Sequence, residues 1–179
     1  MPDRIALVVI DMINTFDFPR GPALLRAAKA VVPRLARLKS RVKAAGGICV
    51  YANDNFADWN SDFQTLVALA AQSKGACLLD VVSPSDDDPH ILKPRHSAFH
   101  QTALDFVLNS LNVRRVLVAG ISTESCVLAT ALDAHIRDLD VQVVSDCVAS
   151  SSPTRRLHAL SVLRYCEIPT VAAAKVIVR

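Results

Sequence analysis

Five short apolar runs, rich in β-branched residues, constrain the fold of this chain more than any other feature. A strand with one exposed face alternates apolar and polar residues. These runs are nearly continuous, so each is predicted to be a strand covered on both faces. A weaker sixth candidate, residues 90–93, follows the loop SPSDDDP. The five main runs are residues 5–10, 48–52, 116–119, 141–144 and 170–174.

Segments with a helical repeat of mainly apolar residues lie between these runs. Residues 104–111 and 128–135 repeat at i, i+3, i+4 and i+7, which is typical of a helix with one buried face. Residues 24–45 show the same repeat, but Pro33 interrupts it and should kink or restart the helix, which the pair Gly46-Gly47 should end. Strands that alternate with helices predict a parallel sheet with right-handed crossovers.

The predicted fold class is α/β, as a single three-layer domain over residues 1–179. We expect a mostly parallel, doubly wound sheet of about six strands with helices on both faces. A chain of 179 residues is long enough for one well-buried domain and short for two. No internal repeat, low-complexity tract or linker rich in Pro, Gly or Ser divides it.

The charge and hydropathy patterns indicate which partners to expect. The net charge of +3 is small and Lys and Arg are scattered, so neither nucleic acid nor a membrane is an expected partner. No apolar stretch reaches the ~20 residues that span a bilayer, and the first residues lack the layout of a signal peptide. We expect a cytoplasmic homo-oligomer that binds a small-molecule substrate.

The five cysteines favour neither a disulfide framework nor a structural zinc site. Their number is odd, they are widely spaced, and no CxxC pair or Cys-His grouping occurs. A free cysteine in an apolar run usually behaves as a small core residue. Four cysteines are therefore expected to be protonated and shielded: Cys49, Cys77, Cys147 and Cys166.

Polar residues with catalytic chemistry follow the predicted strands. In open α/β sheets, ligands bind outside the carboxyl ends of the strands. Asp11 follows the first run, Asn-Asp-Asn at 53–55 follows the second, Lys93 ends the weak run, and the turn GISTESC at 120–126 follows the run 116–119. A carboxylate, an ammonium and a thiol are predicted to meet at one edge. Taken singly, Asp11 also fits a helix cap or turn residue, and Lys93 fits a surface lysine.

Cys126 is the candidate nucleophile because of its place in this turn. Ser122 or Thr123 can cap the following helix and put the thiol in its first turn, where the helix dipole should lower the thiol pKa. Backbone amides in such a turn also point outward and can bind an oxyanion. The alternative is that Cys126 is only a small buried apolar side chain.

Other motifs fit the sequence less well. The fifth residue of GISTE is Glu124, where a nucleophile elbow needs Gly. The motifs GxGxxG and GxxxxGK[ST] are missing, so no nucleotide is expected. Three aspartates at 86–88 could attract a cation, but they are better interpreted as a solvated loop.

Three motifs resemble the isochorismatase-like cysteine hydrolases, a family that includes nicotinamidase and N-carbamoylsarcosine amidase. The family's Asp-x-x-Asn-x-Phe after an apolar strand matches VVIDMINTF, its Lys-x-x-x-Ser-Ala-Phe matches KPRHSAF, and its Gly-x-x-Thr-x-x-Cys-Val matches GISTESCV. The resemblance implies a catalytic triad of Asp11, Lys93 and Cys126. It also implies a cis peptide between Ile121 and Ser122, and an oxyanion hole formed by the amides of Ser122 and Cys126.

Two departures from the family pattern bear on the substrate. Ile13 and Thr15 stand where many members have Gln and Asp. Nicotinamidases hold a metal with an Asp-x-His and a further His, whereas this chain has Asn55 at the first His position and no His following nearby. We therefore expect no metal and no cofactor. The histidines near the Lys93 segment are not expected to bind a metal either; they are His90, His96 and His100.

Together, Cys126 and the resemblance predict a cysteine-dependent hydrolase that cleaves a small amide, carbamoyl or imide C–N bond through a thioester. Isochorismatases that hydrolyse a vinyl ether generally lack the cysteine. Nearness to the motifs suggests Phe16, Asn55, Trp59 and Phe99 as walls of the substrate pocket. Two alternatives stay open: a catalytically silent member that binds a ligand or a partner chain, and an isochorismatase-type vinyl-ether hydrolase.

Overall fold

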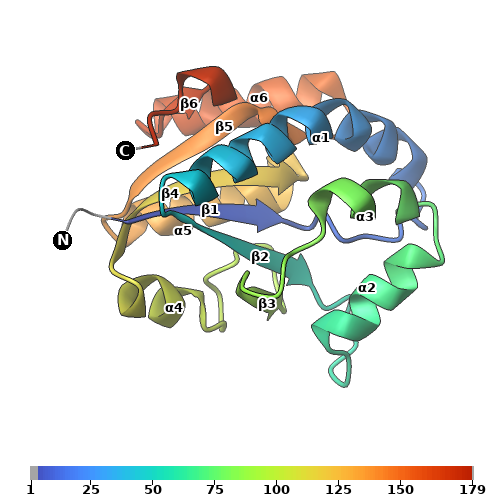
Figure 1. Ribbon diagram of the computed structural model, residues 1–179. Coiled ribbons are helices and arrows are strands. Elements are labelled where there is room, and N and C mark those ends of the chain that lie inside the picture. Colours follow the sequence, from blue (N-terminus) through green and yellow to red (C-terminus); the bar gives the residue numbers. More distant parts are fainter. Residues whose placement is uncertain (1–3, 179) are drawn as a thin grey trace.

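A six-stranded sheet forms the centre of the protein (Figure 1). The computed structural model describes residues 4–178. The strand order is β3-β2-β1-β4-β5-β6, and every neighbouring pair is parallel. The prediction of a doubly wound sheet is confirmed, because the chain builds outward from β1 to β3 and then returns to add β4 on the other side. The strands are β1 (Arg4–Ile10), β2 (Ile48–Asp54), β3 (His90–Lys93), β4 (Val113–Ile121), β5 (Asp140–Ala149) and β6 (Thr170–Val171).

Within residues 4–178, six α-helices cover both faces of the sheet. One apolar cluster packs α1, α2 and α3 against one face, and a second packs α4, α5 and α6 against the other (Figure 1). None of these helices combines the length and the apolar character that a membrane crossing requires. The helices are α1 (Gly21–Ala44), α2 (Phe63–Ala71), α3 (Ala76–Val82), α4 (Leu104–Ser110), α5 (Leu128–Ile136) and α6 (Pro153–Tyr165), with a π-helix η1 (Thr123–Val127) and a 3-10 helix η2 (Ala173–Lys175).

The last predicted strand is shorter than its apolar run. Only Thr170 and Val171 pair with β5, so the expectation of a strand over 170–174 is wrong beyond Val171. The side chain of Asp146 accepts a hydrogen bond from the Ala173 amide at 2.7 Å, where a longer strand would bond to the neighbouring backbone. Arg41 donates to the carbonyl oxygens of Ala173 and Val176, both at 2.7 Å, and so holds the chain in the η2 turn.

Helix α1 continues through Pro33 as one element of 24 residues, so the expectation of a restart there is wrong. Pro33 has no N–H group, so the carbonyl of Lys29 loses its helical hydrogen bond. Both residues lie on the exposed face of the helix, where water can replace that bond. Val32 and Leu35 on either side are buried in the core. Their packing against the sheet holds the two halves of the helix together.

Strands β1 and β4 approach each other closely at their carboxyl ends. Gly120 has a φ of +116° and pairs with Ile10. A Cβ atom on Gly120 would lie 2.1 Å from the Ile10 carbonyl oxygen, so any side chain would push the strands apart. Because Asp11 follows Ile10 directly, this glycine keeps Asp11 close to the turn that carries Cys126.

We expect Gly120→Ala to lower the free energy of unfolding by about 3 kcal/mol or more, because both the positive φ and the Ile10 backbone oppose a Cβ atom. Gly46→Ala is the control. Gly46 also has a positive φ, of +79°, but its Cβ would meet nothing within 4 Å, so only the conformational cost of about 1–2 kcal/mol applies. Urea unfolding measures both changes. An equal loss of unfolding free energy in the two variants would mean that the close approach of β1 and β4 is not the reason for glycine at position 120.

Candidate active site

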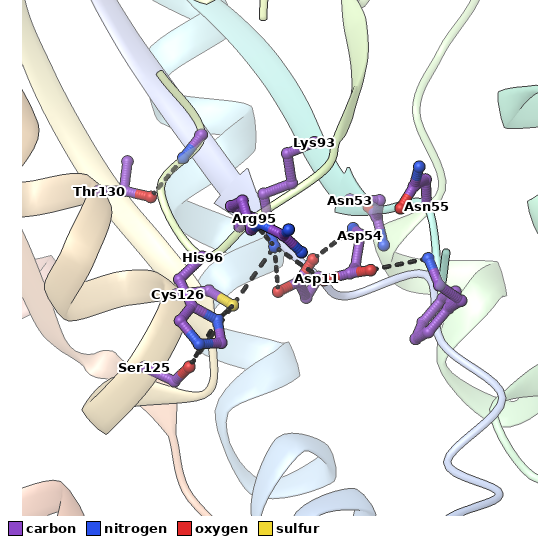
Figure 2. Close-up of polar contacts among 12 residues, drawn as sticks. Asp11, Asn53, Asp54, Asn55, Lys93, Arg95, His96, Ser125, Cys126 and Thr130 are labelled. Atoms are coloured by element: carbon purple, nitrogen blue, oxygen red, sulfur yellow. Dashed lines mark hydrogen bonds and ion pairs between the residues drawn. The ribbon is translucent and has the colours of Figure 1, made fainter. Parts of the chain in front are cut away.

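Three side chains from different strand ends meet at the carboxyl edge of the sheet (Figure 2). Asp11 follows β1, Lys93 ends β3, and Cys126 lies in η1 directly after β4. The Lys93 Nζ atom is 3.0 Å from Asp11 Oδ2 and 3.3 Å from Cys126 Sγ. All three residues are buried. The structure thus brings the carboxylate, the ammonium and the thiol together in one cluster.

The backbone around Asp11 directs its carboxylate into this cluster. Asp11 has a φ of +53°, a left-handed conformation that is uncommon outside glycine. Its amide donates to the Ala52 carbonyl at 2.9 Å, and its Oδ1 accepts a hydrogen bond from the Asp54 amide at 2.7 Å. The alternative that Asp11 caps a helix does not hold, because its carboxylate bonds to the end of β2 and to Lys93.

Lys93 is fully buried, which excludes the alternative of a surface lysine. Its ammonium contacts Asp11, lies 3.6 Å from Asp54 Oδ2, and donates to the Arg95 carbonyl at 3.3 Å. Burial acts to lower the pKa of Lys93, but the charges of Asp11, Cys126 and Asp54 outweigh it and raise the pKa. Lys93 therefore stays protonated.

The expected lowering of the Cys126 pKa is wrong. Burial, and after it the negative charge of Asp11, raise the pKa of the thiol to about 12, although Lys93 acts in the opposite direction. Burial also raises the pKa of Asp11. Burial thus opposes ionisation of both the Asp11 carboxyl and the Cys126 thiol, while the Lys93 ammonium favours it.

The turn that carries Cys126 differs from the expected helix start. Ser122 precedes η1, but its side chain makes no capping hydrogen bond, and Thr123 Oγ1 is buried with no partner among residues 4–178. Side-chain capping by either residue was therefore a wrong expectation. The amides of Ser125 and Val127 instead bond to the Ser122 carbonyl, at 3.1 and 3.2 Å. The peptide bond between Ile121 and Ser122 is cis.

The four suggested pocket residues lie in different surroundings. Phe16 is fully buried in the core cluster that contains α1, so it cannot contact a ligand as it stands. Phe99 is buried in the opposite cluster, and the Arg137 guanidinium lies 4.8 Å from its ring centroid. Trp59 is 74% exposed, and Asn55 Oδ1 accepts from the Ala57 amide within the same loop. Of the four, only Asn55 and Trp59 reach solvent.

Three further polar residues lie at the cluster, none of which the sequence assigned to the triad. Asp54 is the second carboxylate near Lys93, and His96 Nδ1 and Ser125 Oγ each lie 3.8 Å from Cys126 Sγ. Asp54 is the last residue of β2 and part of the polar stretch 53–55, and Ser125 adjoins Cys126. His96 was considered only as a metal ligand. Position at the end of a strand is thus a sequence signal that points to Asp54. No sequence signal identifies His96 as a neighbour of the thiol.

The other cysteines and the histidines lie in separate surroundings. Cys49 and Cys147 are buried, and burial raises the pKa of Cys49 to about 11 and that of Cys147 to about 12. Cys77 and Cys166 are exposed, so the expectation that they are shielded is wrong. Cys77 lies on the outer side of α3 and Cys166 at the end of α6. In the described part of the chain, no group of three or more His, Cys, Asp or Glu residues could hold a metal ion.

An all-parallel α/β sheet with a buried Asp-Lys-Cys cluster at its carboxyl edge defines the structural class of this chain. Residues 5–175 match the isochorismatase domain model. The chain therefore belongs to the isochorismatase domain family, and the resemblance seen in the three motifs is confirmed.

Similar proteins cover most of the chain. The isochorismatase family protein YaaI of Bacillus subtilis, itself uncharacterized, is 33% identical over 168 residues, which are 92% of this chain and 93% of that protein. Maleamate amidohydrolase of Pseudomonas putida is 28% identical over 151 residues, 80% of this chain and 71% of that protein. The crystal structure of N-carbamoylsarcosine amidase from Thermoplasma acidophilum has a TM-score of 0.71 at 25% identity and covers 97% of this chain and 98% of that chain.

Proposed function

We propose that this protein is a cysteine-dependent hydrolase that cleaves the C–N bond of a small amide, carbamoyl compound or imide through a thioester. One observation carries the proposal: the fully buried Lys93 ammonium contacts both the Asp11 carboxylate and the Cys126 sulfur. Burying a charged pair lowers the stability of a fold, so a buried Asp-Lys pair indicates a function. Acyl transfer by a thiol requires a group beside the sulfur that can accept and return a proton, and Asp11 is placed for that role. The similarity to an amidohydrolase and an amidase supports the choice of a C–N bond.

The proposed reaction begins when Cys126 Sγ attacks the substrate carbonyl carbon and passes its proton to Asp11. The C–S bond forms, and the carbonyl electron pair moves to the oxygen. Asp11 then gives the proton to the leaving nitrogen, the C–N bond breaks, and the acyl group remains on Cys126 as a thioester. Lys93 stays protonated and opposes the negative charge, first on Asp11 and then on the sulfur.

The oxyanion of this reaction is proposed to bind the amides of Ser122 and Cys126. Among residues 4–178, the Ser122 amide donates to no backbone or side-chain acceptor, so it is available to a ligand. Both amides belong to the turn that begins with the cis peptide, close to the thiol. Such preformed donors stabilise a developing oxyanion without having to reorganise.

A catalytically silent binding protein is the main rival, and the raised pKa of Cys126 favours it, since an inert buried thiol would show the same shift. A panel of small amides, carbamoyl compounds and cyclic imides, assayed for ammonia release with and without a metal chelator, separates the two functions. We expect release from at least one compound, undiminished by the chelator, and lost in Cys126→Ala by about 10³-fold or more.

Cys166→Ala is the matched control, because Cys166 is an exposed cysteine at the end of α6. It should keep full activity. Ammonia release that survives Cys126→Ala would exclude a cysteine mechanism. Silence of the wild-type protein across the whole panel would favour the binding protein, and a panel extended to vinyl ethers would test the isochorismatase-type reaction.

A further inference from the structure

The Cys126 sulfur has a second polar side that the proposed acylation does not use. His96 Nδ1 and Ser125 Oγ each lie 3.8 Å from Sγ, and these two atoms are 3.2 Å from each other. In Figure 2 the His96 ring lies on the other side of the sulfur from Asp11. His96 is exposed, whereas Asp11 is buried. The thiol thus lies between a buried carboxylate and an imidazole that faces solvent.

The position of His96 is built into the fold although its ring is exposed. The next residue, Ser97, donates to Asp133 Oδ2 at 2.5 Å, and the Ala98 amide donates to Thr130 Oγ1 at 3.0 Å. Both acceptors belong to α5, the helix that continues from η1. The segment that carries His96 is therefore bonded to the same structural unit that carries Cys126, which holds the imidazole at the sulfur.

The second half of a thioester mechanism needs a base that can reach water. Asp11 Oδ1 already accepts from the Asp54 amide at 2.7 Å, and Oδ2 lies 3.0 Å from the Lys93 ammonium. Both oxygens of Asp11 thus already have partners inside the buried cluster. His96, by contrast, is exposed to solvent and lies on the other side of the sulfur.

We propose that His96 is the general base that activates water for hydrolysis of the Cys126 thioester. The inference rests on the proposed function. His96 Nδ1 takes one proton from the water, whose oxygen forms a bond to the acyl carbon. The tetrahedral adduct collapses, the C–S bond breaks, and its electron pair returns to Sγ, held by Lys93. The proton on the imidazole then passes to the sulfur, so that one thioester and one water give one carboxylic acid and one thiol.

The groups that face the His96 ring are Cys126 and Ser125 from η1, with Lys93 and Asp11 beyond the sulfur. The side of the sulfur toward His96 therefore carries an imidazole that can accept a proton, while the other side carries the Asp11–Lys93 ion pair.

The experiment uses p-nitrophenyl acetate, an activated ester that acetylates a nucleophilic thiol without any need for amidase activity. Intact mass and peptide mapping follow formation and loss of acetyl-Cys126 in the wild type, in His96→Gln and in His100→Gln, an exposed histidine of the same segment. We expect His96→Gln to acetylate at a rate close to that of the wild type, but to lose the acetyl group about 100-fold more slowly. His100→Gln should match the wild type. Free imidazole should restore deacylation in His96→Ala.

Each other outcome has a defined meaning. If acetyl-Cys126 disappears equally fast in His96→Gln and in the wild type, His96 is not the base and Asp11 serves both steps. If the ester never acetylates Cys126 in the wild type, the inference and the proposed thioester fail together. If His96→Gln accumulates the acetyl-enzyme while no amide in the panel is hydrolysed, the role of His96 stands and the proposed C–N substrate class fails alone.

Discussion

Replacing Asp11 with asparagine is expected to lower turnover by between about 10²- and 10⁴-fold while making the Cys126 thiol easier to ionise. Asparagine cannot carry the proton from the thiol to the leaving nitrogen. At the same time, the charge of Asp11 is one of the causes that raise the pKa of Cys126, so its removal should lower that pKa. The variant would thus have more thiolate near neutrality and less activity.

Ultraviolet absorbance of the thiolate, taken as the difference from Cys126→Ala, follows ionisation across pH. In Asp11→Asn the thiolate should appear at lower pH than in the wild type. Asp17→Asn is the control, since the Asp17 side chain is 84% exposed and far more solvated, and it should change neither quantity. Full activity in Asp11→Asn, on any substrate found, would show that another group carries the proton.

The second large effect is expected for Lys93→Met, which removes the ammonium that compensates the buried Asp11 carboxylate. Breaking a buried ion pair from one side costs about 3–5 kcal/mol of stability. The loss should be largest at high pH. Burial already raises the pKa of Asp11 in the folded protein, and without Lys93 this rise is greater. The folded variant therefore binds a proton that the unfolded chain releases, and its stability falls as the pH rises above the pKa of Asp11 in the unfolded chain.

Urea unfolding at several pH values measures this loss. The double variant Asp11→Asn/Lys93→Met should recover much of it, because it buries no unpaired charge. Lys74→Met is the control, with a side chain that is 61% exposed. Lys93→Met should also slow labelling of Cys126 by iodoacetamide, since Lys93 acts to lower the thiol pKa. A double variant no more stable than Lys93→Met would contradict the charge argument.

Two features of the fold and site were predictable from local sequence. Continuous apolar runs located the strands, because a strand covered on both faces has no polar positions to interrupt it. Parallel strands all end at one edge of a sheet, so residues such as Asp11 and Lys93, placed directly after or at the end of a run, had to lie near one another. The extent of β6 was not predictable, since the Asp146 and Arg41 side chains that end it come from distant parts of the chain.

The sequence by itself determined the strands, the parallel α/β arrangement and the edge at which Asp11, Lys93 and Cys126 gather, because each follows from residue periodicity and from position along the chain. Only the tertiary structure decided how these groups behave. Complete burial of Lys93, the raised pKa of Cys126 and the place of His96 beside the sulfur all depend on contacts between segments that are distant in sequence. Burial removes water from charged groups, and its effect on the thiol pKa exceeded the effect expected from a helix start.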